Sequence, residues 1–381
     1  MNPTTRLAND NVNEKVLYMA MELSQKKWCL AFGDGVKKRQ VVIQANDLGA
    51  LNGAIMKAKE KFKLPNETKV ISCYEAGRDG FWIHRHLEEQ GINNHIVDSS
   101  SIKVDRRARR AKTDRLDGDK LLKQLILHVR GDEKLQVVRV PTEAHEDERR
   151  RHRERERLTR EKTGHTCRIK ALLNLYGIKC KNPGKKGWKS YIENIRDWKG
   201  ELLQAYQKQE LLREIDRLEM VKKQLKDLET DMWNELKAEG DQSSSSVMIK
   251  QLMRLKGVGK VSSWILIKEW FAWRKFKNRR EVGAAAGLVG SPYDSGDSRK
   301  EQGITKAGNR RIRALMVELA WSWLRYQPDS ELTKWFMERF NGKRSRKIGI
   351  VALARRLLIA IWRYVTAGVL PEGAKLKSVA V

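Results

Sequence analysis

The first third of the chain alternates between strand-like and helix-like hydrophobic patterns. Three short segments, Lys15–Met21, Trp28–Phe32 and Arg39–Gln44, predict strands, with a hairpin turn at residues 33–35 between the last two. The further predicted elements are a helix from Asp47 to about Phe62, a strand at Lys69–Tyr74, a helix at Phe81–Gln90, a strand at His95–Asp98 and a helix from Thr113 to about Val129. A three-strand meander followed by alternating helices and strands is the order of an RNase H-like α/β domain, expected over residues 1–140. An unspecified α/β sandwich is the alternative.

A charged helical connector is predicted over residues 141–246. Residues 146–170 are almost entirely charged or polar, and apolar side chains then recur at helical spacing from Leu211 to Trp233 among Glu and Lys. This periodicity predicts long helices in a coiled-coil hairpin, with an apolar stripe used for packing or dimerisation. Four consecutive serines in Asp241–Ser246 predict a flexible linker at its end.

The last part, residues 247–381, is predicted to be a predominantly helical domain. A Gly-Val-Gly stretch at residues 257–259 precedes an apolar helix at Val261–Phe271. Glycines at such a place let backbone N–H groups approach a phosphate near a helix N-terminus. The stretch therefore predicts a helix-hairpin-helix-like element with Lys256 and Lys260 as nucleic-acid contacts. Close helix packing is the alternative explanation of the glycines.

The composition is strongly basic, with 78 Lys and Arg against 48 Asp and Glu in 381 residues and a formal net charge of +30. A surplus this large predicts nucleic-acid binding with steep salt dependence. No apolar stretch reaches the roughly 20 residues of a spanning helix, so we expect no membrane partner. The four scattered cysteines argue against a disulfide framework or structural zinc, and the N-terminal segment lacks a signal-peptide pattern. We expect a reduced, cytoplasmic protein.

Four acidic residues stand out by their placement. Glu22 and Glu75 each follow a predicted strand, and Asp114 and Asp117 lie three apart at the start of a predicted helix, on one face of it. Carboxylates from two strand ends and one helix can converge on a hard divalent cation, which prefers oxygen ligands. In a basic chain this arrangement predicts metal-assisted chemistry on a polyphosphate. The alternatives are helix-dipole complementarity for the aspartates and an ordinary strand-end acid for Glu22.

A dense basic run precedes the two aspartates. Between Ser101 and Arg115 there are seven basic residues and two acids. Beside candidate metal ligands, such a run predicts a clamp on a phosphate backbone, with a solvated charge run as the alternative. The predicted clamp residues are Arg106, Arg107, Arg109, Arg110 and Lys112.

A second segment of interest, residues 285–313, is rich in glycine and small polar residues. Gly and Pro are expected to keep its backbone irregular around Ser291 and Ser295, and the cations Lys306, Arg310 and Arg311 follow. A serine can attack a phosphodiester when its proton is removed and cations hold the developing charge. On chemistry alone, a polar DNA-contacting loop explains these residues better, because no histidine base is nearby.

Three stretches, in this order, resemble a known family. They are residues 74–76 (Tyr-Glu-Ala), residues 112–117 (Lys-Thr-Asp-Arg-Leu-Asp), and residues 286–311, which contain Ala-Gly-Leu, Ser-Gly and Lys-Ala-Gly-Asn-Arg-Arg. Over nearly its whole length the chain is similar to the DEDD transposases of the insertion-sequence 110 family, including its 1111-type branch, the bridge-RNA-guided recombinases. The resemblance implies a RuvC-like N-terminal domain, a helical connector and a helical C-terminal transposase domain.

The resemblance also implies roles for individual residues. Glu75, Asp114 and Asp117 match three of the four RuvC-like acids, and Glu22 fills the first position, where the family usually has Asp in a Gly-Ile-Asp-Val-Ser context. Ser295 matches the family's serine, which would attack DNA to form a phosphoserine link with Mg²⁺ at the acids. The implied partners are donor and target DNA, a structured bridge RNA, and further copies of the chain in a homodimer that forms a tetramer on DNA.

Two other functions are compatible with these residues. A RuvC-like structure-selective endonuclease would hydrolyse branched DNA with metal and water alone, without Ser295. A catalytically silent nucleic-acid-binding protein is the third possibility, because Glu22 departs from the usual Asp. The presence or absence of a covalent protein–DNA adduct distinguishes the first two functions.

Overall fold

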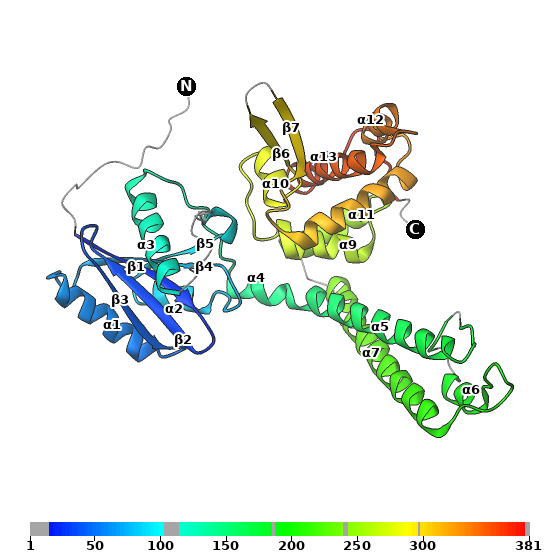
Figure 1. Cartoon of the computed structure of the whole chain (residues 1–381). Helices are drawn as coiled ribbons and strands as arrows, with labels where there is room; N and C mark the ends of the chain where they lie inside the picture. Colours follow the sequence, from blue (N-terminus) through cyan, green and yellow to red (C-terminus); the bar gives the residue numbers. More distant parts are fainter. Residues whose placement is uncertain are drawn as a thin grey trace. The chain divides into compact units, whose positions relative to one another are not determined.

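The computed structural model describes residues 15–102, 114–180, 182–184, 187–238, 243–295 and 298–377, and within these ranges it leaves out the side chains of 114–115, 292–295 and 298–302. The chain forms two compact units, Met1–Val140 and Pro141–Val381, each described here by itself (Figure 1). The predicted boundary at residue 246 falls within the second unit. The division into three domains stays a prediction.

A five-stranded mixed sheet forms the centre of the first unit. Its strands are β1 (Val16–Leu23), β2 (Lys27–Gly33), β3 (Lys38–Gln44), β4 (Lys69–Glu75) and β5 (Asn93–Val97), in the order β3-β2-β1-β4-β5. β1, β2 and β3 pair antiparallel, whereas β4 is parallel to β1 and to β5. The predicted mixed α/β arrangement is confirmed, although β5 begins at Asn93 rather than at His95.

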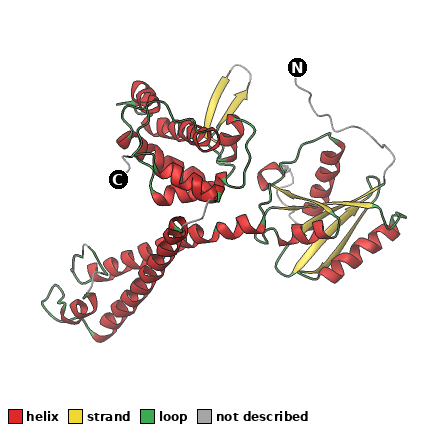
Figure 2. Cartoon of the chain, turned by 180° about the vertical axis from the view of Figure 1, so that it is seen from behind, coloured by secondary structure: helices red, strands yellow, loops and turns green. Residues whose placement is uncertain are grey.

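Helices cover both faces of this sheet (Figure 2). α1 (Leu48–Lys61) and α2 (Trp82–Glu89) pack on the face that carries Met19. α3 (Asp114–Arg130) packs on the opposite face, which carries Ala20. Successive strand residues point to opposite faces, so this alternation decides which β1 and β4 side chains lie on the α3 side.

Local signals set the ends of the first helix. Asp47 is its N-cap, as predicted, and its side chain accepts a hydrogen bond from the N–H of Ala50 at 2.8 Å. The helix ends with Phe62 as its C-cap. A short 3-10 turn, η1 (Ser99–Ser101), follows β5 and begins at its own N-cap, Asp98.

Two long helices dominate the first part of the second unit. The elements there are α4 (Glu143–Glu148), α5 (Arg150–Asn174), α6 (Trp188–Asn194) and α7 (Ala205–Lys237). Arg155 Nε lies 2.7 Å from Glu229 Oε1. Further along α5, His165 Nδ1 lies 2.8 Å from Glu214 Oε2, so α5 and α7 run antiparallel. The predicted stripe from Leu211 to Trp233 is buried as far as Leu225 and partly buried at Leu228 and Trp233, which confirms the helical hairpin.

The C-terminal part of this unit is mainly helical. Its elements are α8 (Ser244–Met253), α9 (Lys260–Ile265), the π-helix η2 (Leu266–Phe271), α10 (Arg279–Ala285), β6 (Gly290–Ser295), β7 (Ser298–Ile304), α11 (Arg310–Tyr326), α12 (Glu331–Phe340) and α13 (Arg346–Ala367). Trp264, Trp270 and Trp323 are almost completely buried in its core. Met232 and Leu236, at the end of α7, belong to the same core, so the connector and the C-terminal helices are packed together.

Two predictions for the second unit are wrong. The segment Asp241–Ser246 is not a linker throughout, because α8 begins at Ser244 and Ser243 caps it by accepting the N–H of Ser246 at 3.3 Å. The segment around Ser295 is not irregular, because β6 and β7 form an antiparallel hairpin. Cross-strand pairing satisfies the backbone groups that a loop would leave to water. The predicted helix at 261–271 is present but divides into α9 and η2.

The four cysteines are free thiols, as predicted. Cys29 and Cys73 are buried in the first unit, and burial raises the pKa of the Cys73 thiol. Among the described residues, no helix is both long and apolar enough to cross a bilayer.

Candidate active site and nucleic-acid contacts

Glu22 and Glu75 occupy neighbouring positions where two parallel strands end. Met21 of β1 pairs with Tyr74 of β4, and the same register continued by one residue sets Glu22 opposite Glu75. Ala20 faces α3, so Glu22, two residues later, is on that face too. Cross-strand partners share a face, and Glu75 therefore points to the same side. The sheet thus brings together two of the four predicted acids.

The third element of the predicted site, α3, begins at the same end of the sheet. A Cβ placed on Gly118 would lie 3.7 Å from the Cβ of Ala31. Further along α3, Leu122 lies 3.3 Å from a Cβ placed on Gly33, at the other end of β2. Because β2 is antiparallel to β1, α3 starts toward the end of β1 where Glu22 lies. The backbone of the first turn of α3 therefore lies toward these strand ends.

Asp117 is half-buried and has one neighbouring cation. Its Oδ1 lies 3.7 Å from Lys120 Nζ, one turn further along α3. Asp119, on the same helix, contacts β3 instead: it accepts hydrogen bonds from Lys38 and Gln40, both at 2.5 Å. Asp119 thus attaches α3 to β3, whereas the ion pair of Asp117 is with Lys120 on α3 itself.

The four acids are the right kind of ligands for a hard divalent cation. Mg²⁺ prefers carboxylate oxygens, and all four predicted ligands supply them. Among the side chains that the structure describes, no three from Asp, Glu, His or Cys gather closely enough to hold a metal ion. The side chain of Asp114 lies outside that description, so the four-carboxylate site stays a prediction.

The predicted phosphate clamp cannot be placed beside these acids. Its residues lie outside the part of the chain that the structure describes, which stops at residue 102 and resumes at 114. They are Arg106, Arg107, Arg109, Arg110 and Lys112. The clamp stays a prediction from the sequence.

Ser295 is the last residue of β6, at the tip of the hairpin. It pairs with Ser298, the first residue of β7. The cross-strand pair before it joins Asp294 to Arg299. Ser295 belongs to the second unit and the four acids to the first, so their meeting around one phosphate stays a prediction.

The base of the hairpin is closed by two glycines with left-handed backbones. Gly287 has φ +67° and Gly308 has φ +114°. A Cβ on Gly287 would lie 2.3 Å from the oxygen of Ala307, and one on Gly308 would lie 2.2 Å from the oxygen of Ala285. The glycines of the Ala-Gly-Leu and Lys-Ala-Gly-Asn stretches are therefore needed for close backbone packing.

A buried carboxylate, Glu269, joins α5 to the end of this hairpin. It lies on η2 and is 1% exposed. His152 Nε2 is 2.9 Å from its Oε2, and Arg153 binds it with two hydrogen bonds of 3.0 and 3.1 Å. Asn309 donates its side-chain N–H to Glu269 Oε1 at 2.9 Å and also caps α11. The sequence signal for this residue is an acid, next to Lys268, within a mostly apolar segment.

This network shifts the pKa of two of its members. Burial by itself raises the pKa of Glu269, but the hydrogen bonds from His152, Arg153 and Asn309 outweigh it and hold the pKa well below its usual range. Burial lowers the pKa of His152 despite its contact with Glu269. His152 is therefore a neutral donor to an ionised Glu269 at neutral pH.

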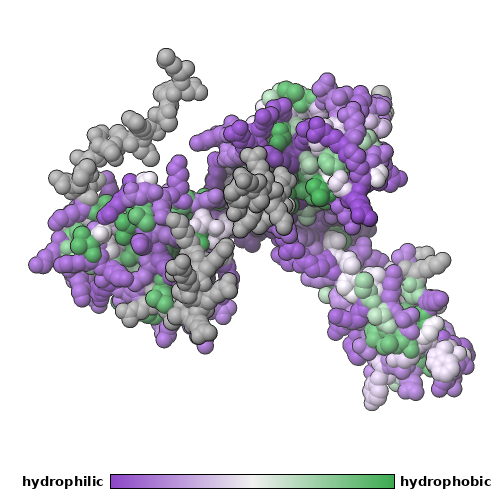
Figure 3. Space-filling model, turned by 45° about the horizontal axis from the view of Figure 1, so that its top comes forward, coloured by the Kyte–Doolittle hydropathy of each residue, from purple (hydrophilic) through white to green (hydrophobic). Residues whose placement is uncertain are grey.

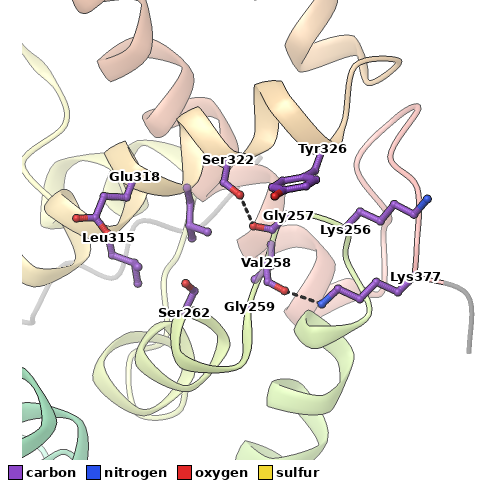
Figure 4. Close-up of a pocket in the computed structure, with 11 residues that line it drawn as sticks. Lys256, Gly257, Val258, Gly259, Ser262, Leu315, Glu318, Ser322, Tyr326 and Lys377 are labelled. Carbon is purple, nitrogen blue, oxygen red and sulfur yellow. Dashed lines mark hydrogen bonds between the residues drawn. The ribbon is translucent and has the colours of Figure 1, made fainter. Parts of the chain in front are cut away.

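The predicted hairpin at residues 257–259 forms one wall of a pocket of about 510 Å³ (Figure 4). Ser322 donates to the carbonyl oxygen of Gly257 at 2.7 Å, and Lys377 donates to that of Val258 at 2.9 Å. A Cβ on Gly257 would lie 3.3 Å from the Cβ of Tyr326. Close packing on α11 thus accounts for Gly257, and the helix-hairpin-helix assignment stays a prediction.

The five predicted cations of this unit differ in how free they are to bind an anion. Lys256, Lys306 and Arg310 are exposed. Lys260 is exposed too, with its Nζ 5.7 Å from the ring centre of Trp233. Arg311 is committed to α5, because its Nε lies 2.6 Å from Glu156 Oε2. Arg311 therefore holds two elements together in this structure.

Comparison with known proteins identifies the family. The family described as “Transposase IS116/IS110/IS902 family” matches residues 249–334, which run from α8 into α12. The protein y4rJ of Sinorhizobium fredii, named as a candidate transposase, is 39% identical over 376 residues, covering 95% of each chain. The chain belongs to the IS116/IS110/IS902 family of transposases. Membership extends over the whole chain because the similarity to y4rJ does.

Two further relatives of this transposase are more distant. The protein y4qE of the same organism, also named as a candidate transposase, is 28% identical over 82% of this chain and 72% of its own length. The transposase for insertion sequence element IS1328 of Yersinia enterocolitica is 25% identical over 38% of this chain and 42% of its own length. The matched family region contains the hairpin, Glu269 and Asn309.

Proposed function

We propose that this transposase is an RNA-guided DNA recombinase that cuts and rejoins donor and target DNA through a phosphoserine link at Ser295. Family membership supports the class of reaction. The observation that carries the proposal is the register of β1 and β4, which sets Glu22 beside Glu75 where α3 begins. Carboxylates from three elements at one end of a sheet suit phosphoryl transfer better than acids scattered over the surface would.

In this proposal the first unit is a RuvC-like member of the RNase H-like fold. The strand order β3-β2-β1-β4-β5 supports it, because an antiparallel meander is followed by two parallel strands. The layers also support it, with α3 on the face that carries the acids and α1 and α2 on the other. Bound at Glu22, Glu75, Asp114 and Asp117, Mg²⁺ would supply Lewis-acid stabilisation of charge on the phosphoryl oxygens.

The serine of the hairpin would perform the covalent step. Ser295 Oγ forms a bond to phosphorus and loses its proton to solvent, while the bond from phosphorus to a deoxyribose oxygen breaks and that oxygen takes up a proton. In rejoining, a hydroxyl of the new strand attacks the phosphoserine and Ser295 leaves. The number of phosphate ester bonds is unchanged at each step, so no external energy source is needed.

Sequence choice in this proposal comes from base pairing with a structured bridge RNA, while the protein contacts shape and backbone. The net charge of +30 supports binding to polyphosphates, which DNA and RNA both are. The antiparallel α5–α7 hairpin offers a surface for the homodimer and for a tetramer on DNA.

The test is a cleavage assay on supercoiled plasmid carrying cognate ends, read for covalent protein–DNA adducts. Ser295→Ala should form no adduct, whereas Ser291→Ala, the matched control on the same strand, should form it normally. Asp117→Asn should abolish cutting, whereas Asp119→Asn, which only loosens a contact with β3, should largely retain it. Cutting by Ser295→Ala at the wild-type rate would instead establish the hydrolytic endonuclease. A wild-type protein without Mg²⁺-dependent cutting would establish a silent binding protein.

A further inference from the structure

A large basic groove lies beside the base of the Ser295 hairpin. It has a volume of about 1140 Å³. Its walls come from α10, α12 and α13, together with Gly290 of β6 and Gly303 of β7. Ser295 is five residues beyond Gly290 on the same strand, about 17 Å at the usual rise per residue.

The charge of this groove is all of one sign. α10 contributes Arg279 and Arg280, and α13 contributes Lys347, Arg355, Arg356 and Arg363, with Lys306 as the seventh cation. No described Asp or Glu lines the groove, and none of these seven cations has an ion-pair partner among the described residues. The nearby acid Glu281 is turned to its own helix start, where it accepts the N–H of Lys277 at 2.7 Å.

A folded protein pairs most of its clustered cations, because like charges destabilise one another. This cost appears at Arg356, whose pKa burial lowers, with further lowering by Arg339 and Arg355. Seven cations around one groove, without an acidic partner among the described residues, therefore indicate an anionic ligand that supplies several negative charges. A chain of phosphates fits this requirement, whereas a single small anion would leave most of the cations unpaired.

The groove also has apolar lining residues. Leu332, Val351 and Ile359 line it, and Ile348 is 71% exposed. The Arg356 guanidinium lies 3.9 Å from the ring centre of Trp335. Figure 3 shows apolar area enclosed by hydrophilic residues on this part of the chain. Duplex DNA presents its phosphates outward and stacks its bases inside, so it would not contact these apolar residues.

We propose that this groove, here called the α10–α13 groove, binds an unpaired DNA strand and delivers it to the tip of the β6–β7 hairpin. In this binding mode the cations contact the phosphates, and the apolar lining residues contact sugars and base faces. The strand is DNA rather than RNA because the groove continues into the hairpin of a transposase, whose substrate is DNA. The delivery step rests on the proposed function of Ser295, but strand binding does not.

The test is fluorescence anisotropy of the full-length protein with one labelled 20-nucleotide strand, its duplex, and the RNA of the same sequence, over a range of salt. Lys347→Gln with Arg363→Gln removes two exposed groove cations. Lys223→Gln with Lys226→Gln, on the exposed side of α7, removes the same charge outside the groove. Unchanged thermal unfolding would show that each double variant is folded.

The groove variant should bind single-stranded DNA at least about tenfold more weakly at low salt. Its log–log salt slope should be shallower by about 1.4, because each phosphate contact on a single strand contributes roughly 0.7. The α7 variant should bind nearly as the wild type does. The assignment would be overturned if both double variants lost the same affinity for single-stranded DNA. It would also be overturned if the groove variant lost affinity only for the duplex or only for the RNA. Adduct formation at Ser295 is a separate measurement, so either proposal can fail without the other.

Discussion

Single residues decide whether the Ser295 hairpin can be held at all. Gly287 and Gly308 bring two backbone segments into contact that no Cβ could enter, with Cβ-to-oxygen distances of 2.3 and 2.2 Å. Backbone packing thus explains why the Ala-Gly-Leu and Lys-Ala-Gly-Asn stretches have glycine at these two positions. Lys306, just before this contact, has φ +56°, so it too is held in a left-handed conformation that a non-glycine residue rarely adopts.

Gly287→Ala should therefore lower the free energy of unfolding of the second unit by about 2–3 kcal/mol, through backbone strain and displacement of Ala307. Urea unfolding measures this change. The control is Gly164→Ala, inside α5, where a Cβ would meet nothing within 4 Å. That change should be neutral or stabilise by up to about 1 kcal/mol. Equal stability of Gly287→Ala and wild type would refute the packing role.

At the scale of elements, the hairpin is tied to the connector by charged contacts. Glu269 of η2 joins His152 and Arg153 of α5 to Asn309, the cap of α11. Arg311 and Glu156 make a second link between the same two helices. A displacement of α5 therefore changes the position of the segment that follows β7.

This network should make the second unit sensitive to acid. The unfolded chain takes up a proton at His152 below about pH 6.5, whereas the folded state resists it because burial lowers the pKa. Stability is therefore lost as pH falls below about 6.5, by at most about 1.4 kcal/mol per pH unit from this group. Below about pH 4.5, Glu269 adds a loss in the same direction, because its folded pKa is also lowered.

The measurement is the free energy of unfolding between pH 7.5 and 5 for the wild type and for His152→Gln, whose amide can still donate to Glu269. The variant should be less stable at pH 7.5 by about 1–3 kcal/mol, because a buried contact is replaced by a poorer one. Its stability should depend less on pH. An identical pH dependence in both proteins would show that His152 does not resist protonation.

At the scale of the whole molecule, the candidate catalytic groups are divided between the two units. The candidate acids are in the first unit, and the hairpin with its basic groove is in the second. A net charge of +30 suits partners that carry many phosphates. In the proposed function these partners are DNA and a structured bridge RNA.

The protein purified from cells that carry its own element should therefore contain one enriched, structured RNA. Sequencing of the co-purified nucleic acid should return a single dominant transcript from the element's non-coding end. The Ser295→Ala variant should retain it, because RNA binding precedes the chemistry. A broad mixture of cellular RNA in proportion to abundance would contradict guidance while leaving the cutting chemistry intact.

Much of the local structure follows from the sequence because it depends on near neighbours. The short apolar strands of the first unit, the Asp47 cap and the long helices of the connector are all set by patterns of nearby residues. The acids Glu22 and Glu75 were found the same way, each at the end of an apolar strand. Ser295 could be selected only by resemblance, since nothing in its own chemistry distinguishes it from Ser291.

What the sequence left open depends on contacts between distant residues. Strand order, and with it the meeting of Glu22 with Glu75, is decided by which strands pair across the sheet. The cations of the α10–α13 groove come from two helices and the loop that holds Lys306, and only packing shows that no described acid neutralises them. The adjacent Arg355 and Arg356 within an apolar helix were the sole local signal. Charge balance and burial are properties of assembled surfaces, so tertiary structure alone could determine them.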